Sequence, residues 1–193
     1  MHILSLKDEN VQQLRAHHPA LQSKKLVGRG VFGAVFEAAD PSRVLKLTTD
    51  FKHINYLIDG RAPKGPYKPV VFEYFGPVGE TSNGETLYLI EIERLHRLRR
   101  GTHNGRMAQR ITRFFRKNDV FPERSKYLPD LTAEMAEFMY DLNCFFIRFS
   151  CAGDPGWSNF MERPDGTLVF SDPICDDRLL AQAQWKHHQQ RMQ

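Results

Sequence analysis

The stretch LVGRGVFGAVFEAADPSRVLKLTTD, residues 26–50, combines closely spaced glycines with the small and β-branched residues that are typical of strands. Gly28, Gly30 and Gly33 stand in G-x-G-x-x-G spacing, and Lys46 follows after a DPS turn. The pattern predicts a β-hairpin and then a third strand that contains Lys46. The glycine-rich turn either holds the phosphates of a nucleotide or is an ordinary hairpin, and its own residues leave both interpretations open.

The residues on either side of this stretch predict a mixed first half. A helix is expected around 9–18, and apolar periodicity with a closing glycine predicts a short helix over 49–60. Two strands are expected at 68–78 and 85–95, joined by TSNGE, whose Asn-Gly pair favours a hairpin. The predicted order is therefore helix, three strands, a short helix and two further strands.

The second half is predicted to be mainly helical. Helices are expected within 94–117, over 131–149 and over 176–193. The clearest is 131–149, where apolar residues recur at spacings of three and four, whereas 176–193 is polar on most of its faces. Short strands are expected at 160–163 and 167–172, separated by a PDG turn. The fold class predicted for the whole chain is α+β.

Composition narrows the class of protein. The chain has 193 residues, of which 41% are hydrophobic and 26% charged, as in a folded domain or two small lobes. No signal-peptide pattern and no apolar run of membrane-spanning length is visible, so a cytoplasmic location without membrane contact is expected. Three cysteines without C-x-x-C spacing predict neither a disulfide framework nor a zinc site.

Charge is concentrated in one segment. Residues 94–117 contain nine Arg or Lys and no Asp or Glu. Such a segment can attract nucleic acid, an acidic protein or a phosphorylated substrate, and it can equally be a solvated helix face. The sequence leaves these alternatives and the oligomeric state open.

Three polar residues late in the chain carry the chemical signal. In GDPGWSNFMERPDGTLVFSDP, part of a predicted loop over 150–159 and the hairpin after it, Asp154 precedes Asn159 by five positions and Asp172 follows the hairpin. Phosphoryl transfer needs a carboxylate for the acceptor hydroxyl and oxygen ligands for magnesium. Each residue alone has a structural explanation, as a turn, a cap or a strand end, but their order with the glycine turn favours phosphoryl transfer.

The strand-loop-strand setting of the glycines also favours this chemistry. A dinucleotide-binding fold would continue into a helix, whereas here a second strand follows. Gly28, Gly30 and Gly33 would let the main chain approach phosphates, Val35 would point at the base, and Lys46 would reach phosphate oxygens.

These motifs resemble those of the protein-kinase-like superfamily, over about 26–174 and in the order G-x-G-x-x-G-x-V, V-L-K, D-x-x-x-x-N and a later Asp. The chain is most similar to the compact early serine/threonine protein kinases of podoviruses, short-tailed phages that phosphorylate host proteins during host takeover. The resemblance implies a minimal two-lobed kinase-like fold. An antiparallel sheet with one short helix would form the N-lobe, 1–93, and a truncated, mainly helical C-lobe would follow over 94–193.

The resemblance also implies ATP and magnesium as cofactors and host proteins of the bacterial cytoplasm as substrates. It assigns catalysis to Asp154 and Lys46 and metal binding to Asn159 and Asp172. Ile90 would be the gatekeeper, and the backbone from Glu91 to Glu93 would hold the adenine, although a buried strand with surface carboxylates fits the same residues.

The sequence departs from the kinase pattern at several positions. Ala152 and Gly153 replace the His and Arg that precede the catalytic Asp, and 172–174 reads Asp-Pro-Ile instead of Asp-Phe-Gly. No helix glutamate is evident as the partner of the strand lysine, for which Asp59 is preferred to Asp50. The A-P-E segment is missing, so the basic segment is a candidate for peptide recognition. A kinase-like binding module without transfer, or a small-molecule kinase, remains the alternative.

Overall fold

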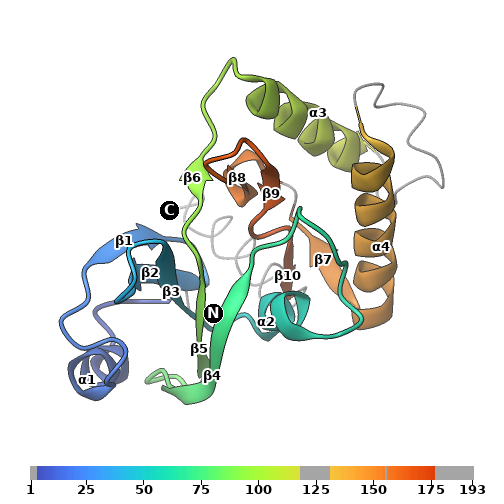
Figure 1. Ribbon diagram of the computed structural model, residues 1–193. Helices are drawn as coiled ribbons and strands as arrows, with labels where there is room; N and C mark the ends of the chain where they lie inside the picture. Colours follow the sequence, from blue (N-terminus) through green and yellow to red (C-terminus); the bar gives the residue numbers. More distant parts are fainter. Residues whose placement is uncertain (1–3, 118–130, 155, 177–193) are drawn as a thin grey trace, which may run out of the picture. The chain divides into compact units, whose positions relative to one another are not determined.

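A computed structural model describes residues 4–117, 131–154 and 156–176 and shows an α+β chain (Figure 1), which confirms the predicted class. Four α-helices and a five-stranded antiparallel sheet are its main elements within these ranges. No helix in the described part of the chain is long and apolar enough to cross a membrane.

The chain divides into two compact units. Among the described residues, the first unit comprises 4–54 and 70–94, and the second comprises 55–69 and 95–176. The division falls inside one short helix and again just after the last strand of the large sheet.

The first unit is built on the large sheet, whose strand order is β1-β2-β3-β5-β4 with every neighbouring pair antiparallel. The strands are β1 (Leu26–Arg29), β2 (Gly33–Glu37), β3 (Arg43–Thr48), β4 (Val71–Glu80) and β5 (Thr86–Glu93). Helix α2 (Phe51–Ile58) lies between β3 and β4 in sequence, so the predicted order of elements is confirmed. β4 is an edge strand, where its Pro77 removes no interior hydrogen bond.

Helix α1 (Glu9–His17) is fixed to the sheet at its start. The Asp8 carboxylate caps the helix by accepting from the N–H groups of Asn10 at 3.1 Å and Val11 at 3.3 Å. It also accepts from the Ser82 N–H and hydroxyl in the β4–β5 hairpin, the latter at 2.5 Å. Burial alone would raise the pKa of Asp8, but these hydrogen bonds lower it below its ordinary value.

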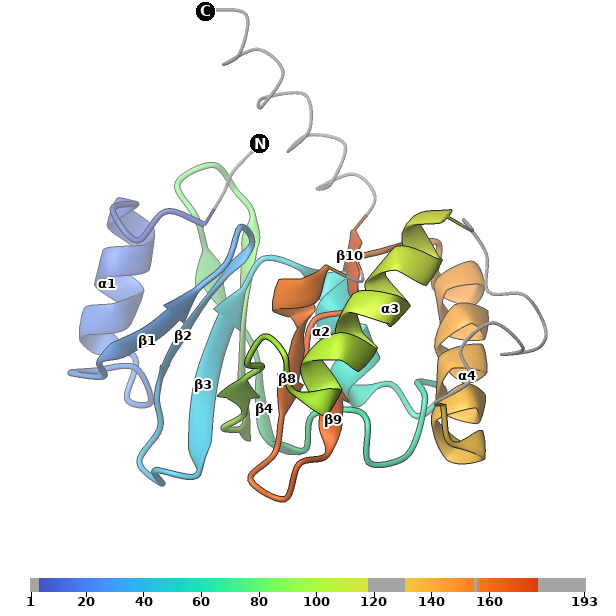
Figure 2. The ribbon, with the colours of Figure 1, turned by 90° about the horizontal axis from the view of Figure 1, so that it is seen from above.

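One face of the sheet forms the core of this unit with α1 (Figure 2). Side chains alternate between the two faces of a strand, so every second residue of β2, β3 and β5 lies in this core. The buried members are Leu4, Val11, Leu21, Ala34, Phe36, Leu45, Leu47, Leu87 and Leu89. The residues between them, Val35, Lys46 and Ile90 among others, belong to the opposite face.

The second unit contains two longer helices and two small sheets. The helices are α3 (His103–Lys117) and α4 (Ala133–Phe149), and a 3₁₀ turn, η1, spans Trp157–Asn159. One sheet has the order β6-β8-β9 and the other pairs β10 with β7. Their strands are β6 (His96–Arg97), β7 (Cys151–Gly153), β8 (Phe160–Glu162), β9 (Leu168–Phe170) and β10 (Ile174–Asp176).

Most predictions for this half are confirmed, with three corrections. The helix predicted over 131–149 and the two short strands are present. The basic segment, a candidate helix from 94 to 117, is helical only from His103, because His96–Arg97 pairs with β8 as strand β6. The loop predicted over 150–159 is wrong in part, because β7 forms there by pairing with the remote strand β10. The last predicted helix starts one residue too early at least, since Asp176 belongs to β10, and its remainder lies outside the described residues.

Candidate functional site

Four of the residues predicted to bind nucleotide lie in one row across the large sheet. Gly28 of β1 is opposite Val35 of β2, Val35 is opposite Lys46 of β3, and Lys46 is opposite Ile90 of β5. Directly opposed residues share a face, so these four form a transverse row on the face that does not pack on α1. Ile90 is fully buried, and Lys46 is 9% exposed.

The glycine turn between β1 and β2 is held against the end of β3. The Gly30 N–H donates to the Gly33 carbonyl at 2.8 Å, which closes the turn. The Phe32 carbonyl accepts from the Thr49 N–H at 3.0 Å and from the Thr48 hydroxyl at 2.9 Å. The tip of the turn is therefore fixed by two consecutive threonines.

The glycines of this turn differ in what the hairpin itself demands of them. A Cβ at Gly33 would lie 3.0 Å from the Leu47 carbonyl oxygen, so close packing on β3 accounts for this glycine. At Gly30 the nearest atom would be 3.9 Å away, and at Gly28 the Val35 side chain would be 3.6 Å away, both ordinary contacts. Hairpin packing thus explains Gly33 but not the other two.

Lys46 has a partner that sequence reasoning missed. Its Nζ lies 2.9 Å from Nε2 of His53, which is on α2 and fully buried. The backbone N–H of His53 donates to the Asp50 carboxylate at 3.0 Å, so Asp50 caps the start of α2. A histidine one turn after a helix cap is the only sequence signal for this contact, and it is a weak one.

Asp59, the residue that the sequence favours as the partner of the strand lysine, has a different partner in the structure. Asp59 accepts from Nε of Arg61 at 2.9 Å and from Nη2 at 2.6 Å. These side-chain hydrogen bonds, with that from the Arg61 N–H, lower the pKa of Asp59 to about 2. Asp59 thus forms a local ion pair at the end of α2.

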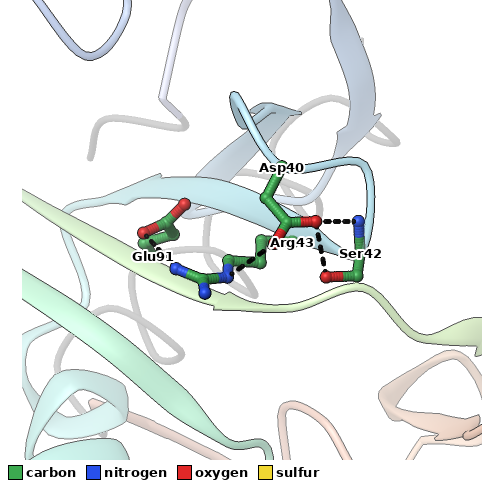
Figure 3. Close-up of polar contacts among 4 residues, drawn as sticks. All are labelled: Asp40, Ser42, Arg43 and Glu91. Atoms are coloured by element: carbon green, nitrogen blue, oxygen red, sulfur yellow. Dashed lines mark hydrogen bonds and ion pairs between the residues drawn. The ribbon is translucent and has the colours of Figure 1, made fainter.

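The two carboxylates of β5 have structural partners. Figure 3 shows Arg43 between Glu91, 3.6 Å from its Nη1, and Asp40, 3.2 Å from its Nε. The Glu93 carboxylate accepts from the Val70 N–H at 2.9 Å, and the Glu93 N–H donates to the Val70 carbonyl at 3.0 Å. The side chains are thus used within the sheet, as expected, and an adenine would need backbone groups other than the Glu93 N–H.

The second unit brings Asp154, Asn159 and Asp172 together, and we call them the Asp-Asn-Asp cluster. The Asn159 side-chain amide donates to the Asp154 carbonyl at 2.7 Å. The Asn159 carbonyl accepts from the Ser171 N–H at 2.9 Å and from the Asp172 N–H at 3.2 Å. The Asp154 N–H in turn donates to the Pro173 carbonyl at 2.8 Å, so the three residues are joined through their backbones.

The cluster has donors suited to a magnesium ion. Because Nδ2 of Asn159 is used by Asp154, its amide oxygen is turned away and receives a weak contact of 3.4 Å from the Ser158 hydroxyl. Gly156 lies beside the Asp154 carboxylate, since a Cβ there would be 3.5 Å from Oδ1, an ordinary contact. Carboxylate and amide oxygens fit magnesium, which fills its other positions with water and phosphate. No group of three His, Cys, Asp or Glu side chains forms a metal site within the described residues.

Two tyrosines hold the strand that leads to Asp172, and neither was identified from sequence. The hydroxyl of Tyr56, on α2, donates to the Phe170 carbonyl at 3.0 Å, and the Phe170 N–H donates to the Tyr67 carbonyl at 2.8 Å. Tyr56 is fully buried. Burial, and then the nearby charge of Asp172, raises the pKa of Tyr56 well above its ordinary value.

Part of the basic segment lies on the exposed face of α3. The buried face of this helix carries Met107, Ala108, Ile111 and Phe114, and Arg106, Arg110 and Arg113 are exposed. This arrangement fits a solvated face and a polyanion-binding face alike.

A cavity of about 280 Å³ lies elsewhere in the second unit. Its lining includes Arg61, Lys64, Asp141, Cys144 and Arg148, and none of the predicted site residues. The cavity is therefore separate from the Asp-Asn-Asp cluster.

No protein-family model matches this chain, and no curated protein matches its sequence. The function is therefore argued from the chemistry of its residues.

Proposed function

We propose that this chain is an ATP- and magnesium-dependent phosphotransferase, a compact protein kinase that acts on serine or threonine hydroxyls. In this proposal Lys46 and the glycine turn bind the phosphates, Asn159 and Asp172 hold magnesium, and Asp154 orients and deprotonates the acceptor hydroxyl. Host proteins in a bacterial cytoplasm are the proposed acceptors.

The observation that carries the proposal is the Asp-Asn-Asp cluster. Asp154 and Asp172 are remote in sequence, yet Asn159 connects them, because its side-chain amide donates to the Asp154 carbonyl and its backbone carbonyl accepts from the Asp172 N–H. Phosphoryl transfer needs a carboxylate that acts on the acceptor hydroxyl and oxygen ligands that bind the cation, and the cluster contains both.

The transverse row supports the same chemistry. Lys46 is a cation on the sheet face that does not pack on α1, and an ammonium held on a strand is suited to phosphate oxygens. Gly28 and Gly30 are not required by the packing of their hairpin, whereas a close approach of phosphate to the main chain would require them.

The proposed reaction transfers one phosphoryl group. The bond from the γ-phosphorus to the oxygen retained by ADP breaks, a bond to the acceptor oxygen forms, and the hydroxyl proton passes to Asp154. Bound magnesium would offset the charge of the phosphates. Lys46 would hold phosphate oxygens in place by charge-assisted hydrogen bonds.

One observation favours a second candidate, a binding module that carries out no transfer and redirects a host protein. The kinase pattern has a helix glutamate for the strand lysine, whereas α2 contains no glutamate and brings the imidazole of His53 to 2.9 Å from Nζ of Lys46. This candidate predicts that the folded protein binds a partner but transfers no phosphate.

The deciding experiment follows labelled γ-phosphate from ATP and magnesium into proteins of a bacterial lysate. Asp154→Ala and Asp172→Ala should each reduce labelling by about 10²- to 10⁴-fold. The control is Asp141→Ala, an exposed carboxylate on α4 that should leave labelling unchanged. Chelation of magnesium should abolish the signal.

Absence of labelling by the folded wild type would contradict a protein kinase. The same fractions would then be tested for ATP consumption with small hydroxyl compounds, which separates a small-molecule kinase from a binding module.

A further inference from the structure

We infer that His53 is a positioning residue for Lys46, and this inference rests on the proposed phosphotransferase function. Lys46 is 9% exposed and His53 is fully buried, and their side-chain nitrogens are 2.9 Å apart. A buried ammonium needs acceptors in place of water, and His53 provides one.

The contact defines the tautomer of His53. The Lys46 ammonium can only donate, so Nε2 of the imidazole must carry the lone pair, and the ring proton is on Nδ1. The contact therefore orients Lys46 through the lone pair of the imidazole.

A chain of hydrogen bonds fixes His53 relative to the glycine turn. The Thr48 hydroxyl donates to the Phe32 carbonyl at 2.9 Å and accepts from the Asp50 N–H at 3.1 Å. The Asp50 carboxylate then accepts from the His53 N–H at 3.0 Å. The tip of the turn, the start of α2 and the ring on Lys46 thus belong to one connected network within the first unit.

His53 also has little freedom to leave this position. It lies in the first turn of α2, whose start is fixed by the Asp50 cap and by the Ile54 N–H, which donates to the Asp50 carbonyl at 3.2 Å. Phe51, at the first position of the same helix, packs against Tyr88 of β5 with ring centroids 5.2 Å apart. The start of the helix is therefore attached to two neighbouring strands, to β3 through Lys46 and to β5 through Tyr88.

The test compares His53→Leu, which removes the acceptor, with His53→Gln, whose side-chain oxygen can accept from Lys46. Loss of a hydrogen bond to a charged group should raise KM for ATP or lower kcat/KM about 10- to 100-fold in His53→Leu. His53→Gln should recover most of this loss. His17→Leu, at an exposed histidine of α1, is the control and should leave both constants unchanged.

A second readout needs no activity. In ¹⁵N spectra of the imidazoles, the His53 signals should show a protonated Nδ1 and an unprotonated Nε2 and should change in Lys46→Met, while the His17 signals should not. If the wild type transfers no phosphate, the proposed function fails, and this readout still tests the pair.

Two results would overturn the positioning role of His53. One is an active wild type with the same KM and kcat/KM as His53→Leu. The same conclusion would follow if His53→Leu and a folded His53→Gln lost the same amount of activity. The other is a set of His53 signals that does not respond to Lys46→Met.

Discussion

Removal of one hydroxyl group should measurably destabilise the second unit. In Tyr56→Phe the hydrogen bond of 3.0 Å to the Phe170 carbonyl is lost, and this carbonyl would remain in a buried environment. The net value of such a bond is about 1 kcal/mol, and a carbonyl left without it adds to the cost, so we expect a loss of about 1–2 kcal/mol. With an unfolding entropy of about 2.1 cal/mol/K per residue over 193 residues, the melting temperature should fall by about 2–5 °C.

The assay is thermal unfolding followed by circular dichroism, with urea unfolding as a second measure of stability. Tyr74→Phe is the matched control, because the hydroxyl of Tyr74 makes no hydrogen bond within the described residues. The control should change stability by less than about 0.5 kcal/mol. Equal melting temperatures for wild type and Tyr56→Phe would refute the proposed anchoring of Phe170.

The same substitution predicts a change at alkaline pH. Burial and the charge of Asp172 raise the pKa of Tyr56 in the folded protein above the ordinary value of 10.0. At a pH above 10.0 the unfolded state therefore loses the phenol proton while the folded state keeps it. The unfolded state then binds fewer protons, and stability must fall as pH rises above about 10. Tyr56→Phe should lack this part of the alkaline loss. Tyr74→Phe should retain it and lose only the smaller part due to Tyr74, whose pKa burial and then Tyr88 also raise.

Three further predictions concern other parts of the chain. Gly33→Ala should lower the melting temperature because its Cβ would lie 3.0 Å from a carbonyl oxygen of β3. In Gly30→Ala the nearest atom would be 3.9 Å away, so the melting temperature should stay within about 1 °C while ATP binding weakens. Asp8→Asn should cost about 1 kcal/mol at neutral pH by weakening the helix cap and the bonds from Ser82. Because the pKa of Asp8 is lowered from 3.8 in the folded protein, this difference should disappear as acid titration passes below 3.8. Arg113→Ala should weaken binding of single-stranded DNA, if α3 binds polyanions, and reduce the salt dependence of log K by about one charge; an unchanged slope would favour a solvated face.

The first half of the chain was predictable because its signals are local. The Asn-Gly pair that predicted the β4–β5 hairpin has Gly84 at a φ of 78°, a conformation that glycine adopts at little cost. The DPS turn is similarly local, since the Asp40 carboxylate accepts from the N–H and hydroxyl of Ser42. With both turns fixed, the alternation of apolar residues sets the register of β2, β3 and β5.

The parts that were missed depend on contacts between remote residues. β7 has three residues, one of them glycine, and it becomes a strand only because β10 pairs with it. The contact of Lys46 with His53 requires both the register of β3 and the exit angle of α2, and neither can be obtained from composition. Tyr56 is not among the apolar positions that predict α2, and periodicity cannot indicate where its hydroxyl ends.

The pairing of β7 with β10 also explains why the spacing of the Asp-Asn-Asp cluster is informative. Gly153 is opposite Ile174 in this ladder, so the residues just beyond it, Asp154 and Pro173, are brought into hydrogen-bond contact. The β8–β9 hairpin follows Asn159 and brings the chain back to it. Asn159 can therefore form hydrogen bonds with both Asp154 and Asp172.

Packing of β7 accounts for one departure from the kinase pattern. A Cβ at Gly153 would lie 3.1 Å from the Phe146 ring of α4, so a larger residue could enter only if that ring moved. An arginine at this position would therefore require the Phe146 ring to shift by a few tenths of an ångström. The packing of β7 on α4 thus favours a glycine before Asp154, for a reason that does not involve the chemistry of Asp154.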